Sequence, residues 1–145
     1  MMGEVSSVDI RGAQLLLAGG NCQTTLLIYL GICVACLKPY MGKTINELRC
    51  RINGHRSHLK EILSADLCKN DLLIDDTNCL AAHARFCHCV KDNKSFNLLY
   101  KFSIVQKLHD PNLLLRREQF YINKYKTFVP FGLNVSNPIG LYMHF

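Results

Sequence analysis

The chain has 145 residues, of which 49% are hydrophobic and 19% are charged, and 17 Lys+Arg against 11 Asp+Glu give a formal net charge of +6. This length suits one folded domain, and this composition excludes a disordered or low-complexity chain. The most apolar run, Leu26 to Leu37, has about twelve residues, whereas a helix that spans a bilayer needs roughly 20. We therefore expect no membrane-spanning helix and no membrane partner.

The positive charge is concentrated in one part of the sequence. Residues 38–60 contain six bases and a single acid, Glu47. A local basic stripe is typical of a surface that binds nucleic acid or another polyanion, and the alternative is an ordinary solvated helix face. The bases are Lys38, Lys43, Arg49, Arg51, Arg56 and Lys60.

We expect one domain over residues 22–135, with a poorly ordered leader at 1–21 and a C-terminal tail at 136–145. The apolar, β-branched run from Thr25 to Cys33 predicts a buried strand, and residues 38–44 predict a second strand that pairs with it. Thr44 and Glu47 have the spacing of a capping box, which predicts a helix that continues to about residue 63.

Three further elements are expected downstream. Residues 78–85 predict a short helix, and the alternation of apolar side chains from Phe96 to Ile104 predicts a third, half-buried strand. Asp110 followed by Pro111 is typical of a helix start, so a second long helix is expected over about 111–126. The predicted fold class is α/β (α+β), a small three-stranded, mainly antiparallel sheet flanked by helices.

Two helices carry polar residues on faces that otherwise look buried. Glu118 lies four residues after Leu114 and four before Ile122, on the apolar face of the last helix. Burying a carboxylate costs several kcal/mol unless it is paired or binds a metal, so Glu118 is either an ion-pair partner or a metal ligand or acid/base group. Arg51 and His55 share one helix face, as a phosphate-binding arginine beside a functional histidine or as an ordinary surface arginine beside a core histidine.

Cysteine and histidine residues have spacings that suit a metal. Cys33 and Cys36 form a C-x2-C pair, and His83 and His88 form an H-x4-H pair, a set that fits tetrahedral zinc. Cys87 and Cys89 flank His88, so the choice of ligands stays open. Scattered buried thiols are one alternative, and a secreted protein with disulfide bonds is another.

Tyr29 is followed along the chain by Tyr40-Met41-Gly42, then by Arg51 with His55, by Glu118 and by Asn134. This ordered set of residues resembles the GIY-YIG endonuclease superfamily. The runs 40–44, 49–57, 118–125 and 130–134, and the two Cys and two His residues, are similar to the endonuclease domain of Penelope-like retroelements. The likeness covers about residues 22–135. Leu27 stands where the superfamily has the first glycine of its motif, and Met41 replaces the usual Ile or Val.

The resemblance implies a DNA endonuclease that depends on a divalent metal and hydrolyses a phosphodiester bond. It implies that Tyr29 or Tyr40 positions or deprotonates the attacking water, that Glu118 holds Mg²⁺ or Mn²⁺, and that Arg51 stabilises the phosphate. His55 would transfer a proton, and Asn134 would orient the phosphate or a tyrosine, or shape the tail. The remaining implied roles are zinc binding by Cys33, Cys36, His83 and His88, and DNA-backbone binding by Lys38, Lys43, Arg49, Arg56 and Lys60.

The main alternative is a catalytically inactive, zinc-stabilised nucleic-acid-binding remnant of the same fold. The active enzyme predicts that Tyr29, Tyr40, Arg51 and Glu118 meet on one concave face. The remnant predicts displaced tyrosines or a Glu118 held in a salt bridge. In either case the resemblance implies an intracellular, nuclear location.

Overall fold

The computed structural model describes residues 6–64, 73–135 and 139–140. Its central sheet has three antiparallel strands in the order β4 (Pro39–Thr44), β3 (Leu27–Cys33) and β6 (Tyr100–Lys107). The register of β3 and β4 places Tyr29 opposite Gly42. The predicted fold class, a small antiparallel sheet with flanking helices, is confirmed.

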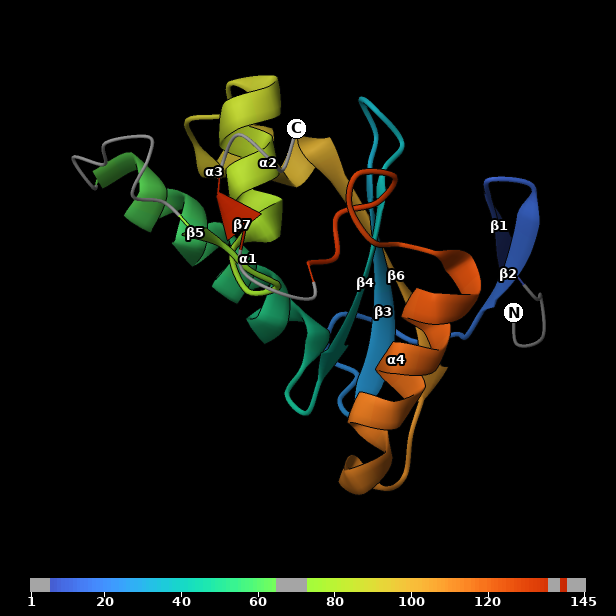
Figure 1. Cartoon of the computed structure of the whole chain (residues 1–145). Coiled ribbons are helices and arrows are strands. Elements are labelled where there is room, and N and C mark those ends of the chain that lie inside the picture. The colour runs from blue at the N-terminus through green and yellow to red at the C-terminus, as the bar shows by residue number, and fades with distance from the viewer. Residues whose placement is uncertain (1–5, 65–72, 136–138, 141–145) are drawn as a thin grey trace.

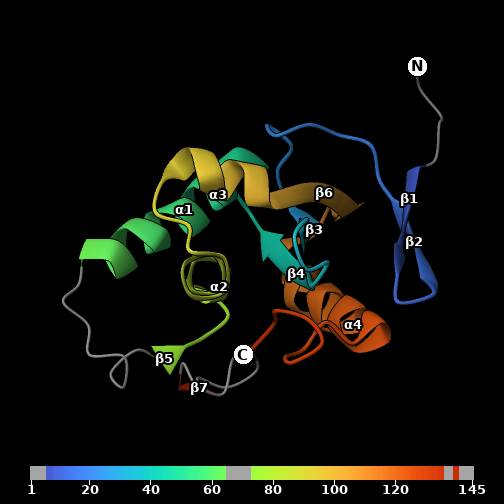
Figure 2. The ribbon, with the colours of Figure 1, turned by 90° about the horizontal axis from the view of Figure 1, so that it is seen from above.

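Helices cover both faces of this sheet, as Figures 1 and 2 show. On one side lie α1 (Leu48–Ser64), α2 (Cys79–His88) and α3 (Asn93–Leu99), and on the other lies α4 (Leu114–Tyr125). Because side chains alternate along a strand, β3 contributes Tyr29 to the core under α1 and α2, and Ile28 and Leu30 to the core under α4. None of the helices in the described ranges is long and apolar enough to cross a membrane.

The expectation of a poorly ordered leader is wrong for residues 6–17. They form a hairpin of β1 (Ser6–Ile10) and β2 (Ala13–Leu17). Arg11 and Gly12 both have positive φ, as a tight two-residue hairpin turn requires. Ile10 and Leu15 are buried in the α4 core, and the amide of Ala18 donates to the carbonyl of Ile104 in β6.

The third predicted strand begins four residues too early, because residues 93–99 form α3. The side chain of Asp92 accepts a hydrogen bond from the amide of Ser95, which caps the helix. Only Phe96 and Leu99 of this stretch are buried, at helical spacing, and β6 then begins at Tyr100.

The helix starts differ from prediction in one case and agree in the other. The capping box does not form: Thr44 Oγ1 accepts from the amide of Asn46, and α1 begins later, at Leu48. The carbonyl of Glu47 accepts from the amides of Cys50 and Arg51, and its side chain pairs with Arg49. The start at Asp110 is confirmed, since its side chain caps the short 3-10 turn η1 (Pro111–Leu113), from which α4 continues.

The free edge of β4 is covered by residues 126–135 rather than by another strand. The amide of Met41 donates to Asn134 Oδ1 at 2.8 Å, and Asn134 Nδ2 donates to the carbonyl of Met41 at 2.8 Å. The amide of Leu133 donates to the carbonyl of Pro39. This covering satisfies backbone groups that an open edge would expose. In the predicted tail, β7 (Ile139–Gly140) pairs with β5 (Leu73–Ile74).

Candidate functional site

Two tyrosines and a histidine pack together on the α1 side of the sheet. Tyr29 and Tyr40 lie on neighbouring strands with ring centroids 6.1 Å apart, and the Tyr29 hydroxyl is hydrogen-bonded to His55 Nε2 at 2.7 Å. Gly42 makes this packing feasible, because a Cβ at that position would collide with the ring and hydroxyl of Tyr29. The glycine of the Tyr-Met-Gly sequence is therefore needed for a close approach.

Arg51 lies beside these groups and is half-buried. Its guanidinium interacts with the hydroxyls of both Tyr29 and Tyr40. Burial raises the pKa of each phenol above its usual range, by more than the nearby arginine lowers it. Both phenols therefore stay protonated at neutral pH and act as hydrogen-bonding groups.

His55 is a fully buried imidazole in this aromatic cluster. Burial, and then the positive charges of Arg51 and His58, lower its pKa from 6.5 to about 3. Its ring stacks on Phe102 with an interplanar angle of 13°, which fixes its orientation. The histidine is thus neutral at physiological pH, and its Nε2 lies within hydrogen-bond distance of the Tyr29 hydroxyl.

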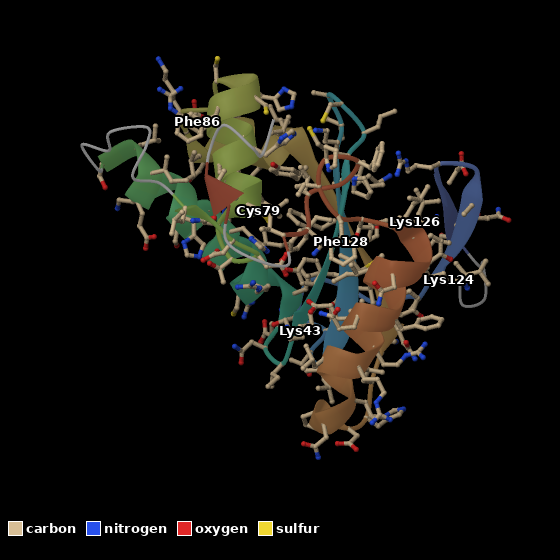
Figure 3. The ribbon with its side chains drawn as sticks, in the orientation of Figure 1. Lys43, Cys79, Phe86, Lys124, Lys126 and Phe128 are labelled. Carbon is tan, nitrogen blue, oxygen red and sulfur yellow. The ribbon has the colours of Figure 1, made fainter. Side chains whose placement is uncertain are left out.

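Glu118 approaches from the opposite face of the sheet. Its exposed fraction is 3%, as expected from its place on the apolar face of α4, and its Oε1 accepts a hydrogen bond from Lys43 Nζ at 3.1 Å. Figure 3 shows Lys43 on β4, and Lys43 and Glu118 both line a pocket of about 360 Å³. Burial raises the pKa of Glu118, and Lys43 opposes that rise. Glu118 is therefore ion-paired in this structure.

Asp76, a half-buried carboxylate that the sequence analysis did not identify, lines the same pocket. Its main-chain carbonyl accepts from the Tyr40 hydroxyl at 3.0 Å, and its Oδ1 accepts from Asn134 Nδ2 and from the amide of Val135, each at 3.1 Å. Burial raises its pKa, against the effect of these hydrogen bonds and of the charges of Lys43 and Arg51. In the sequence, Asp76 belongs only to a turn before a helix. Such a turn does not indicate that Asp76 contacts distant parts of the chain.

Asn134 is occupied by structural hydrogen bonds. Besides its contacts to Met41 and Asp76, its Oδ1 accepts from Thr127 Oγ1 at 2.6 Å, and its exposed fraction is 1%. These hydrogen bonds fit the structural role suggested for Asn134, in which it shapes the chain segment after the last helix.

The sequence-predicted residues are therefore gathered in two adjoining groups. Tyr29, Tyr40, Arg51 and His55 meet on the α1 side, whereas Glu118 lies in the pocket on the α4 side. The pocket lining within the described residues includes Glu118 and Asn134 but neither tyrosine. The two groups meet around the β4 edge, where Asp76 contacts Tyr40 and faces the pocket.

The predicted metal cluster forms at the end of the β3–β4 hairpin. The ligand atoms of Cys33, Cys36, His83 and His88 all lie within 4.8 Å of one another. The Sγ atoms of Cys33 and Cys36 lie 3.4 and 3.3 Å from the Nε2 atoms of His88 and His83, and these two Nε2 atoms are 3.1 Å apart. Tetrahedral zinc has bonds of about 2.3 Å to sulfur and about 2.0 Å to nitrogen. These bond lengths place a sulfur and a nitrogen ligand about 3.5 Å apart and two nitrogen ligands about 3.3 Å apart, close to the separations in the structure.

The two cysteines that flank His88 lie outside the cluster. Cys87 and Cys89 are exposed and are not among the four clustered residues. The described cysteines are all free, which gives no support to a disulfide-bonded protein. The four clustered residues could therefore hold a metal ion without Cys87 or Cys89.

The predicted DNA-binding residues do not form one free basic strip. Lys43 is paired with Glu118, Arg49 with Glu47, and Arg56 Nη1 donates to Asn97 Oδ1 at 2.9 Å. Lys38 is half-buried beside the β3–β4 turn, and Lys60 is exposed toward the far end of α1. The bases are thus spread over several surfaces and partly neutralised.

Comparisons with protein families, with curated proteins and with solved structures find no match to this chain.

Proposed function

We propose that the protein is a metal-dependent DNA endonuclease of the GIY-YIG type that hydrolyses a phosphodiester bond. The observation that carries the proposal is the position of Glu118, a carboxylate with an exposed fraction of 3% that lines a pocket beside Lys43 and Asp76. A nonfunctional helix would more easily bury an apolar residue there. The arrangement of Tyr29, Arg51 and His55 on the other side of the β4 edge supports the same chemistry.

The residues on the α1 side can position a water molecule and stabilise a phosphate. The neutral imidazole of His55 is hydrogen-bonded to the Tyr29 hydroxyl and holds that hydroxyl in place beside Arg51, where it would orient the attacking water. Arg51, positively charged and next to both phenols, would stabilise the negative charge that develops on the phosphate.

The pocket suits a divalent cation. It contains two carboxylates, Asp76 and Glu118, and the ammonium of Lys43 already lies at hydrogen-bond distance from one of them. A hard cation prefers such oxygen ligands, and Lys43, whose side chain is 40% exposed, can move away toward solvent or a DNA phosphate. Mg²⁺ or Mn²⁺ held there would neutralise charge on the phosphate and activate water.

The Cys/His cluster would hold structural zinc in this enzyme. The four ligands leave no open coordination position of the kind that catalytic zinc needs. They join the β3–β4 hairpin to α2, so zinc would fix α2 against the sheet.

One observation favours the second candidate, a zinc-stabilised nucleic-acid-binding remnant without activity. Glu118 is paired with Lys43, as that alternative predicts, and this pair would have to open before a metal could bind. The two tyrosines lie beside Arg51 and His55, but neither of them lines the pocket that contains Glu118. Activity data decide between the two.

The deciding experiment is a plasmid-nicking assay with Mg²⁺ or Mn²⁺ on the wild type and on two variants. Glu118→Gln keeps an oxygen that can accept from Lys43, so it should fold normally and lose cleavage. Arg51→Ala should lose cleavage as well, by about 10²-fold or more, since it removes an electrostatic stabiliser of the transition state. Glu61→Gln is the control, because it removes an exposed carboxylate on α1.

Metal-dependent nicking by the wild type and by Glu61→Gln, but not by the two variants, would establish the enzyme. Nicking that survives in Glu118→Gln would overturn its assignment as the metal ligand. A folded, zinc-loaded protein that binds DNA without cutting it would identify the remnant.

A further inference from the structure

Asp76 connects parts of the site that come from three separate regions of the chain. It lies in the turn before α2, which Asp75 fixes by accepting hydrogen bonds from Thr77 and Asn78. From this fixed turn, the Asp76 main chain contacts β4 through the Tyr40 hydroxyl, and its side chain contacts the segment after α4.

The Asp76 side chain both holds a chain segment and lines the pocket. Oδ1 accepts from the amide of Val135 and from Asn134 Nδ2, both at 3.1 Å, so it holds the segment that covers the β4 edge. The same carboxylate lines the pocket of about 360 Å³ with Glu118 and Lys43. Its negative charge is therefore added to that of Glu118 in one small space.

Two carboxylates share this pocket with one directly bonded positive charge. Lys43 supplies one positive charge for two carboxylates, and its bonded partner is Glu118. Arg51 acts on both carboxylates electrostatically from the other side of the edge. A divalent cation that takes the place of the partly exposed Lys43 would bring two positive charges instead of one and would be held by carboxylate oxygens, the ligands that such a cation prefers.

We propose that Asp76 is a positioning residue of this centre, which holds the Asn134 segment with one carboxylate oxygen and strengthens cation binding at Glu118 with its charge. This inference rests on the proposed function and names a residue beyond it. The two effects are separable by substitution. Asp76→Asn keeps an oxygen acceptor at the same place and removes the charge, whereas Asp76→Ala removes both.

The test measures Mn²⁺ affinity on the zinc-saturated full chain, by the loss of the free-ion electron paramagnetic resonance signal, together with the urea midpoint. Zinc saturation keeps Mn²⁺ away from the Cys/His cluster. Asp76→Asn should weaken Mn²⁺ binding about tenfold or more, with the urea midpoint near that of the wild type. Asp76→Ala should lower both. Glu61→Gln, which removes an exposed carboxylate, should change neither.

The outcomes separate this inference from the proposed function. If Glu118→Gln loses Mn²⁺ binding and Asp76→Asn does not, the role of Asp76 at the cation is refuted while the proposed metal site stands. If Glu118→Gln binds Mn²⁺ like the wild type, the proposed metal site itself fails, and the inference fails with it. If Asp76→Ala keeps the wild-type urea midpoint, its role in holding the Asn134 segment is refuted.

Discussion

The buried imidazole of His55 should make the protein less stable in mild acid. Its pKa is lowered from 6.5 to about 3 by burial and by the positive charges of Arg51 and His58 on the same helix. The other polar groups that pack on it, the hydroxyl of Tyr29 and the ring of Tyr40, are neutral phenols. Below pH 6.5 the unfolded chain therefore takes up a proton that the folded protein excludes.

The sign and size of the effect follow from proton linkage. The stabilisation that comes from keeping His55 neutral is complete above pH 6.5 and is lost as the pH falls toward about 3. With about 1.4 kcal/mol per pH unit in the window where only the unfolded state is protonated, His55 alone lowers the free energy of unfolding by about 2 kcal/mol between about pH 7 and about pH 5. At a urea m-value of about 2 kcal/mol/M, the midpoint moves by about 1 M.

The assay compares urea midpoints at both pH values for the wild type, His55→Gln and His58→Gln. Glutamine does not titrate, so the variant at position 55 should lose the acid-dependent part of the shift, whatever its stability at neutral pH. His58→Gln, at a partly exposed position on the same helix, should keep most of it. Equal midpoint shifts in the wild type and His55→Gln would refute the reasoning.

Two further predictions test the cluster and the aromatic packing. Cys33→Ser combined with Cys36→Ser should abolish zinc binding in native mass spectrometry and lower the melting temperature, because the metal joins the hairpin to α2; unchanged metal content would remove the zinc assignment. Gly42→Ala should lower the free energy of unfolding by about 1–3 kcal/mol in urea titrations, because the added Cβ displaces the ring of Tyr29; a wild-type midpoint would contradict the close approach.

The features that could be predicted from the sequence are those with a strong local pattern. The β3–β4 pair, the start of α4 after Asp110 and the burial of Glu118 all follow from periodicity or from a helix-cap signal that no competing pattern opposes. The Cys/His set was predictable because metal ligation imposes spacing on the chain. The choice among neighbouring cysteines required the fold, since it depends on which side of α2 each thiol occupies.

Two local errors had signals that pointed to the correct structure. In residues 96–104 the apolar alternation typical of a strand outweighed Asp92, three residues before Ser95, which caps α3. In the leader, Val8, Ile10 and Leu15 are apolar residues on either side of Arg11-Gly12. A glycine-containing pair in that place is typical of the tight turn of a β-hairpin. In both stretches short patterns competed, and packing against β6 and the α4 core decided the outcome.

Asp76 could not be found in this way, because its contacts depend on how the β4 edge is covered. An edge strand must have its free backbone groups satisfied, and here the Asn134 side chain, rather than a strand, bonds both backbone groups of Met41. Asn134 needs a partner for its remaining hydrogen, and Asp76 provides it from the turn before α2. The hydrogen bond from Asn134 to Asp76 therefore helps to cover the β4 edge and also holds a second carboxylate in the pocket of Glu118. The same contact serves both the sheet and the proposed cation pocket.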